Sequence, residues 1–424
     1  MMNDNYCFNW KGKNEMLKSI DNIKECNFIL DEKESKNADT TNNLFFECDN
    51  IFCLKHLQKE YSNKIKMIYI DPPYNTRSKK QYNDNFYNKS YSNDFDKNHA
   101  DWLNMMYPRL KLARNLLTHD GVIFISIDDN EQANLKKMCD EIFGEHNFVG
   151  DLIRKTKSTT NNIKTGFNIQ HENTLIFAKN KENILLLGKK KSWSDYKNLD
   201  NDPKGSWIND NPSVKGGCYF EIKNPYTGKV DYPPKHTGWR FSKISFYEFV
   251  KNKKIIFKEK YGENERGFIF KRYKNDVKNK YNTVNSLNVE NIVMNQNATK
   301  HMNKIFPEAD VFQYTKPIEF LKYIIKSNCQ NGDIALDFFA GSGTTAHAMM
   351  ELNAEDGGNR CCISVQMPEL TDYKSEVYKA GYKNVAEITK ERMRRAGEKI
   401  KKEKENTENL DIGFKVFKLA NNNS

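Results

Sequence analysis

A proline-rich turn contains the first residues whose types and spacing could do chemistry. Asp71, Pro72, Pro73 and Tyr74 directly follow residues 65–70, an apolar run that predicts a buried strand. Two consecutive prolines fix φ and remove two N–H donors, so the turn is rigid. The Asp71 carboxylate and the Pro72 carbonyl can then accept both hydrogens of one –NH2 group, while Tyr74 offers a flat face for stacking. The motif predicts a pocket for a planar heterocycle with an amino group; a proline turn with a structural aromatic is the alternative.

A glycine-rich turn forms the second candidate site. Residues 334–339 predict a strand, and Gly341 and Gly343 lie between it and a predicted helix at residues 344–352. Glycines let the backbone approach a ligand closely, and a helix N-terminus presents free N–H groups. The spacing is neither GxGxxG nor a P-loop, because the third glycine and the GK[ST] sequence are absent. The turn predicts a ligand site of another kind; a tight strand–helix connection is the alternative.

Together the two motifs resemble those of the amino-DNA methyltransferases. In that family DPPY is the catalytic tetrapeptide and FxGxG binds S-adenosylmethionine. DPPY precedes FAGSG here, with a variable module between them, which resembles the β class. Further segments are especially similar to the modification subunits of type III restriction systems and to related type II enzymes: residues 46–50, 122–131, 171–180, 316–317, 352–360 and 388–396. The resemblance spans residues 43–400.

The resemblance implies a role for individual residues. Asp71 and the Pro72 carbonyl orient the target amino nitrogen, Pro73 completes the catalytic turn, and Tyr74 stacks on a base flipped out of the duplex. Lys316 is expected to contact the carboxylate end of the cofactor. The remaining cofactor-binding residues, beside Asp71, are expected to be Asp337, Phe338, Phe339, Gly341, Ser342, Gly343 and Thr344, with Gln366 or Glu369 holding the ribose hydroxyls.

The implied reaction is methylation of N6 of adenine in a specific DNA sequence. The adenine amino lone pair is delocalised into the ring, and hydrogen bonds to Asp71 and Pro72 favour a more sp³-like nitrogen that attacks the methyl sulfonium in line. No metal and no covalent enzyme intermediate are expected. DPPY is more usual for adenine and SPPY for cytosine, so N4-cytosine methylation is the first alternative. A nicotinamide-dependent oxidoreductase and an inactive DNA-binding protein are the others.

The elements that must position these motifs alternate between strands and helices. Further strands are predicted at residues 44–47, 122–127, 174–178 and 361–366, and further helices at residues 102–117, 318–325 and 384–404. This alternation predicts an α/β fold with a doubly wound, mostly parallel sheet, the S-adenosylmethionine-dependent methyltransferase fold that the resemblance implies. A change in composition divides the chain into an arm (1–42), a catalytic half (43–180), an inserted target-recognition module (181–310) and a cofactor-binding half with a basic terminal helix (311–424).

Charge points to a polyanionic partner. The 67 Lys and Arg residues outnumber the 56 Asp and Glu residues, for a formal net charge of +11. Such an excess attracts nucleic acid. Within the inserted module, cations are interleaved with aromatic residues, and the DNA contacts are expected from Lys189, Lys190, Lys191, Lys271 and Arg272. A solvated lysine-rich face is the alternative for each cluster.

Other features concern compartment and assembly. The nine cysteines lack zinc-site spacing, which favours reduced thiols in a cytoplasmic protein. No apolar run approaches the roughly 20 residues that span a bilayer, so no membrane association is expected. By analogy with the β class, a homodimer acting on double-stranded DNA is expected, and a restriction subunit is a candidate partner.

Overall fold

The computed structural model describes residues 7–76, 95–159, 166–288, 294–312, 314–404 and 410–420. They belong to two compact units. The larger unit combines Met1–Leu187 with Val284–Ser424, and the smaller unit is Gly188–Thr283. The smaller unit lies inside the module expected at 181–310. None of the described helices combines the length and the hydropathy that a bilayer crossing needs.

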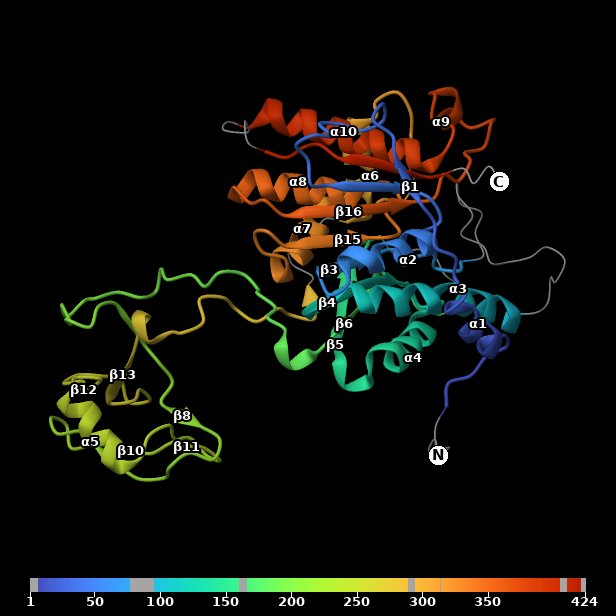
Figure 1. The fold of residues 1–424 in the computed structure, drawn as a ribbon. Coiled ribbons are helices and arrows are strands. Elements are labelled where there is room, and N and C mark those ends of the chain that lie inside the picture. The colour runs from blue at the N-terminus through green and yellow to red at the C-terminus, as the bar shows by residue number, and fades with distance from the viewer. Residues whose placement is uncertain are drawn as a thin grey trace. The chain divides into compact units, whose positions relative to one another are not determined.

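A ten-stranded sheet forms the centre of the larger unit (Figure 1). Every neighbouring pair from β17 to β4 is parallel, whereas β1 and β6 pair antiparallel with their neighbours. In spatial order the strands are β1 (Phe28–Leu30), β17 (Lys415–Leu419), β2 (Leu44–Glu47), β16 (Cys361–Gln366), β15 (Ile334–Asp337), β3 (Ile65–Ile70), β4 (Leu117–Ile127), β6 (His171–Ala178), β5 (Phe148–Lys155) and β14 (Leu287–Asn288).

Helices cover both faces of this sheet because its strands are apolar on both sides. In β3, Ile68 and Ile70 join one buried cluster, and Met67 and Tyr69 join the other. The first cluster is completed by α1 (Lys13–Ile20), α2 (Asn50–Tyr61), α3 (Phe95–Leu116) and α4 (Gln132–Phe143). The second is completed by α7 (Ile318–Asn328), α8 (Thr344–Asp356) and α10 (Val385–Glu403). The predicted fold class, a doubly wound and mostly parallel sheet, is confirmed.

Most predicted elements appear within a few residues of their expected bounds, and β3 and β16 match them. The helix expected at 102–117 is α3, which ends at Leu116, after which β4 begins. Residues 76–100, whose lack of periodicity predicts a long loop, fall mainly outside the described residues, and α3 already begins at Phe95. Strands β1, β5 and β17 were not predicted, and neither was α6 (Asn295–Ile305). The short helix α9 (Glu376–Lys379) completes the elements of the second half.

The N-terminal segment differs from the expected arm. Its strand β1 pairs with β17 at one edge of the sheet, and Met16 and Ile20 of α1 are buried. Apolar residues this widely spaced do not form a periodic pattern, which is why the sequence did not reveal them. Residues 7–42 therefore belong to the packed body of the larger unit.

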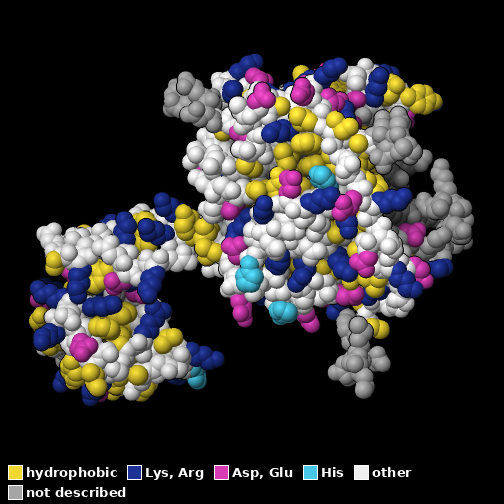
Figure 2. All heavy atoms as spheres, viewed as in Figure 1, with side chains coloured by type: hydrophobic (Ala, Val, Ile, Leu, Met, Phe, Trp, Pro, Cys, Tyr) yellow, Lys and Arg dark blue, Asp and Glu magenta, His cyan; other side chains and the backbone are white. Residues whose placement is uncertain are grey.

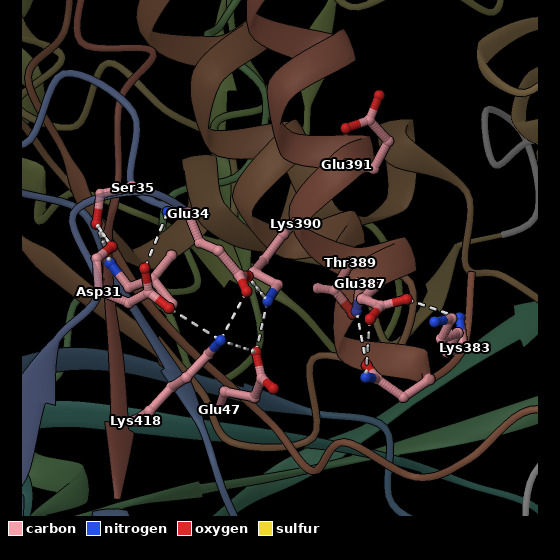
Figure 3. Close-up of polar contacts among 12 residues, drawn as sticks. Asp31, Glu34, Ser35, Glu47, Lys383, Glu387, Thr389, Lys390, Glu391 and Lys418 are labelled. Carbon is pink, nitrogen blue, oxygen red and sulfur yellow. Dashed lines mark hydrogen bonds and ion pairs between the residues drawn. The ribbon is translucent and has the colours of Figure 1, made fainter. Parts of the chain in front are cut away.

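A buried ion network holds this segment to α10 (Figure 3). Lys390 has only 1% of its side chain exposed, and its ammonium contacts the carboxylates of Glu34 and Glu47, the latter at 2.5 Å. Lys418 of β17 also binds Glu34, at 2.6 Å, and Asp31, at 3.0 Å. Two lysines and three carboxylates from four separate parts of the chain thus meet here, and the carboxylates offset the cost of removing the Lys390 charge from water.

The smaller unit has its own aromatic core. Its strands form one three-stranded sheet, β12 (Ile255–Phe257), β13 (Phe268–Tyr273) and β7 (Trp207–Asn209), and two hairpin-like pairs, β9 (Ile222–Lys223) with β10 (Val230–Asp231) and β8 (Ser213–Val214) with β11 (Gly238–Trp239). Helix α5 (Lys243–Lys251) packs with them. The buried residues include Trp239, Phe241, Phe246, Phe268 and Phe270. The smaller unit therefore has an apolar core of its own.

Lys390→Met is expected to lower the free energy of unfolding by about 3 kcal/mol, because it removes the nearest cation from Glu47, whose side chain is only 12% exposed. Glu34 keeps Lys418, so the loss falls at the lower end of the range for broken buried pairs. Urea unfolding measures it. The matched control is Lys399→Met on the same helix, whose side chain is 41% exposed, and which should change stability by under about 0.5 kcal/mol. Equal losses in the two variants would contradict a special role for the network.

Candidate active site and cofactor pocket

One cavity brings the two motifs together. It has a volume of about 370 Å³ and lies where β3 and β15 end, next to each other in the sheet. Of the predicted catalytic and cofactor residues, all but Gly343 line it. The sequence did not assign the other lining residues: Asp49, Asn50, Tyr69, Met105, Arg109, Phe312, Tyr314, Thr315, Ala340, Thr345, Val365, Met367 and Val385.

The proline turn is anchored from behind. Trp102 of α3 donates its indole N–H to the Pro73 carbonyl at 2.7 Å. Asn75, the next residue after the tetrapeptide, has a left-handed backbone (φ 56°), and its amide donates to the buried Glu131 at 2.6 Å. Glu131 lies directly before α4, and its side chain holds this turn rather than capping that helix. Both contacts keep Asp71 in one place at the end of β3.

Asp71 is paired with a buried lysine. The Lys316 ammonium donates to both oxygens of the Asp71 carboxylate at 2.7 Å and to the Tyr74 hydroxyl at 2.8 Å. Burial raises the pKa of Tyr74 well above its usual range, and the nearby Asp71 raises it further. The phenol is therefore neutral at physiological pH, and one cation links the two side chains that were predicted to hold the target base.

A second carboxylate lies behind this pair. Glu172, buried on β6, has one oxygen 3.7 Å from the Lys316 ammonium and the other 2.8 Å from the guanidinium of Arg154. Arg154 is completely buried and also donates to Asn295 at 2.7 Å. The ammonium of Lys316 thus lies between two carboxylates, and its predicted contact with the cofactor carboxylate remains a prediction. Arg154 and Glu172 were not singled out from the sequence because neither lies in a recognisable turn.

The glycine turn is closed by side-chain hydrogen bonds. The Gly341 N–H donates to the Gln366 side chain at 2.7 Å, and the Thr389 hydroxyl donates to the Gly341 carbonyl at 2.5 Å. Gln366 therefore uses its acceptor within the turn, while Glu369 lines the cavity. Gly343 has φ 79°, and a Cβ there would lie 3.1 Å from Thr389, so glycine allows α10 to pack closely against the turn.

Asp337 stabilises the turn from the end of β15. One of its oxygens accepts from the Phe339 N–H at 3.1 Å and the other from the Thr345 hydroxyl at 2.5 Å. Burial raises the pKa of Asp337 to about 7. These bonds join the end of the strand to the first turn of α8, which sets the shape of the cavity on that side.

A polar wall missed by the sequence analysis completes the cavity. Arg109 of α3 donates to Asp49 at 2.7 Å and to Asn50 at 2.5 Å, and Asn50 donates to the Phe338 carbonyl at 2.7 Å. Asp49 and Asn50 lie in the segment at residues 46–50 whose resemblance to the family was noted. Their spacing carried no chemical signal without the packing of α3.

Comparison with known proteins identifies the family of this chain. A family model described as "DNA methylase" matches residues 65–370. The chain belongs to this family. Among curated proteins, the Mod subunit of the type III restriction-modification enzyme EcoP15I from Escherichia coli is 33% identical over 98% of this chain and 71% of its own length. The Mod subunit of StyLTI from Salmonella typhimurium is 36% identical over 91% and 61%.

A second kind of relative is nearly the same length. The type II methyltransferase M.KpnI of Klebsiella pneumoniae is 30% identical over 90% of this chain and 94% of that protein. A solved structure, the cytosine-N4-specific PvuII DNA methyltransferase, covers 84% of this chain and 93% of that one at 14% identity, with a TM-score of 0.40, a distant likeness. The family resemblance inferred from the motifs is confirmed: the chain is a DNA methyltransferase with S-adenosylmethionine as its cofactor.

The cations predicted to bind DNA differ in their surroundings. Lys271 is completely buried and pairs with Asp200 and Asp202 at 2.5 Å each, so its prediction as a DNA contact is wrong. These pairs hold the pKa of the Asp202 carboxyl well below its usual range. Arg272 points to the surface, with 47% of its side chain exposed. The difference follows from strand alternation, which sends neighbouring residues of β13 to opposite faces.

The other predicted DNA contacts remain accessible. Lys189 and Lys190 are exposed and Lys191 is half-buried. Figure 2 shows Lys and Arg side chains interleaved with hydrophobic ones over the visible face of the smaller unit. Cations and hydrophobic side chains thus lie side by side on that unit's surface.

We expect the free energy of unfolding of Asp337→Asn to rise, relative to that of the natural protein, as the pH increases from about 4 to 7. The native carboxyl, with its pKa raised to about 7, keeps a proton that the unfolded chain loses near pH 4. The natural protein therefore loses free energy of unfolding progressively across this window. The variant does not lose it in this way, because asparagine cannot ionise. We expect the difference in unfolding free energy between variant and natural protein to change by roughly 1–3 kcal/mol.

Urea unfolding at several pH values measures this trend. Any pH-independent loss from altered hydrogen bonds cancels, because only the change with pH is compared. Asp372→Asn, at an exposed carboxylate, controls for the change in net charge and should show little trend. A pH-independent difference for Asp337→Asn would contradict the assignment.

Proposed function

We propose that this protein transfers a methyl group from S-adenosylmethionine to N6 of adenine within a specific sequence of duplex DNA, as the modification enzyme of a restriction-modification system. The supporting observation is the single cavity in which Asp71 and Tyr74, at the end of β3, face the glycine turn at the end of β15. The restriction-modification context is supported by the relatives that are named Mod subunits.

The residues at the end of β3 would bind and activate the target nitrogen. S-adenosylmethionine supplies a methyl group on a sulfonium, which a nitrogen lone pair can attack in line. The Asp71 carboxylate and the Pro72 carbonyl accept the two amino hydrogens, which draws the lone pair out of conjugation with the ring. Positioned acceptors of this kind act without reorganisation during the reaction.

Lys316 must yield part of its present contact for this to occur. Its ammonium now contacts both oxygens of Asp71, so an incoming amino group would take over one of them. Lys316 can keep the other oxygen and remain close to Glu172, 3.7 Å away. After transfer the nitrogen carries one proton too many, and Asp71 is the group in contact that can accept it.

The target base must leave the duplex to enter this cavity. An exocyclic amino group of a paired base is engaged in Watson–Crick pairing, so the enzyme must flip the base out, and stacking on Tyr74 would offset part of the unstacking cost. We assign sequence recognition to the inserted module, with Lys189, Lys190 and Lys191 on phosphates. A homodimer and a restriction subunit are part of the same proposal, by analogy with the β class and the Mod subunits.

Asp71→Ala is expected to lower the methyl-transfer rate by about 100-fold or more, because the variant loses one of two positioned acceptors. Transfer of labelled methyl groups to duplex DNA measures the rate, and chromatography of the digested DNA distinguishes N6-methyladenine from N4-methylcytosine. Asp372→Ala, at an exposed position, is the matched control. Near-normal turnover in Asp71→Ala would refute the catalytic assignment, and a methylated cytosine would replace the proposed target base.

Replacing Lys189, Lys190 and Lys191 together by glutamine is expected to weaken binding to all duplex sequences alike. Each lost phosphate contact should reduce the slope of log affinity against log salt by about one unit. Titration of a labelled duplex at several salt concentrations measures both quantities. Glutamine at Lys399, Lys401 and Lys402 of α10 removes the same charge from the other unit and should leave the slope unchanged. Equal effects of the two triple variants would mean that only net charge matters.

A further inference from the structure

Arg392 of α10 is a buried cation without a carboxylate of its own. Its side chain is 2% exposed, and it forms no ion pair with any residue that the structure describes. Burial lowers the pKa of its guanidinium to about 9, which still leaves it charged at neutral pH. A buried charge without a counter-ion is costly, so its surroundings must supply compensation.

Three hydroxyl groups surround one end of this guanidinium. Nη1 of Arg392 lies within hydrogen-bond distance of three hydroxyls, those of Ser342 at 2.6 Å, Thr344 at 2.8 Å and Thr315 at 3.0 Å, and its two hydrogens are shared among them. The same hydroxyls lie 2.8–3.2 Å from one another, and all three residues line the cavity. We call Thr315, Ser342 and Thr344 the hydroxyl cluster. A hydroxyl that accepts from a cation keeps its own proton for donation.

The hydroxyl cluster also lies at the start of a helix. Thr344 is the first residue of α8, which has 13 residues, and the N-terminus of a helix carries partial positive charge and unpaired N–H groups. The positive charge of Arg392 lies behind the cluster. Together with the hydroxyl protons and the helix terminus, it favours an anion on the cavity side.

The neighbours of Arg392 do not neutralise it. Its Nε lies 3.4 Å from Nδ1 of His347, and burial lowers the pKa of that imidazole to about 4, so it is neutral. Glu351 lies beyond the imidazole, 3.2 Å from His347 Nε2, and is itself paired with Lys322 at 3.3 Å. Lys399 on α10 and His301 on α6 are also close to this group and add no negative charge.

The contact between Arg392 and His347 also bears on a candidate metal site. His301, His347 and Glu351 could offer a metal three ligand atoms within 4.8 Å of one another. Because Nδ1 of the neutral His347 ring accepts from Arg392, its proton lies on Nε2. In that tautomer the Nε2 proton points to Glu351, 3.2 Å away.

We propose that the hydroxyl cluster binds the carboxylate of S-adenosylmethionine, with Arg392 as the positioning residue that supplies the counter-charge from behind. The proposal rests on the cofactor of the proposed reaction, which carries one carboxylate. It replaces Lys316 in that role, because the Lys316 ammonium is already engaged by Asp71 and Tyr74. Lys316 then lies beside the target base at one end of the cavity, and Arg392 lies beside the amino-acid end of the cofactor at the other.

Calorimetry with two ligands tests this assignment on the full chain without DNA. S-adenosylmethionine is compared with its decarboxylated analogue, which lacks only the carboxylate. The natural protein should bind S-adenosylmethionine at least 10-fold more tightly than the analogue. Arg392→Met should weaken S-adenosylmethionine about 10-fold or more and change the analogue by under about threefold, so that the preference collapses.

Two further variants keep the test decisive. Thr315→Val removes one hydroxyl at nearly constant volume and should reduce the preference in the same direction, even if Arg392→Met fails to fold. Arg394→Met, on the same helix but 32% exposed and paired with Glu391, should leave both affinities unchanged. Equal losses for both ligands in Arg392→Met and Thr315→Val would show a purely structural role and overturn the proposal. Absence of cofactor binding in the natural protein would instead overturn the proposed function.

Discussion

The parallel pairing of β3 with β15 brings the proline turn and the glycine turn together, although they are far apart in the sequence. Ala335 pairs with Met67 and Leu336 with Ile68, so the two strands end at the same edge of the sheet. The carboxyl ends of neighbouring parallel strands are where α/β proteins build ligand sites. A register shift would move the Asp71 turn along the cavity and reverse the faces of the β3 side chains.

Charged side chains lie on both sides of the cavity that this strand pairing creates. Lys316 lies between Asp71 and Glu172, and Arg154 satisfies the far side of Glu172. On the other side, Asp337 relies on hydrogen bonds rather than on a cation, which is why burial raises its pKa to about 7. Such a site holds its acceptors and donors in place before any ligand arrives, and that preorganisation is the main way in which enzymes stabilise developing charge.

Much of the framework was predictable because it depends on local signals. Continuous apolar runs predicted β3 and β16, which are buried on both faces, and helical periodicity predicted α3, α7 and α10. The edge strand β1 and its neighbour β17 were missed, since short strands that are only partly buried carry a weak pattern. Residues 188–283 form a compact unit within the module expected at 181–310, and their aromatic core could not be assigned without the contacts.

The sequence by itself determined the family, because the proline turn and the glycine turn are local signals: proline fixes the backbone of one, and glycine allows the close packing of the other. Only the tertiary structure decided which partner each charged group has. Lys271, similar in sequence context to its exposed neighbour Arg272, is buried against two aspartates, and Gln366 closes the glycine turn. Arg392 reaches the hydroxyl cluster from a helix near the C-terminus. Burial and ion pairing depend on segments that meet only after folding, so a charge pattern read along the chain cannot distinguish a surface cation from the centre of a buried network.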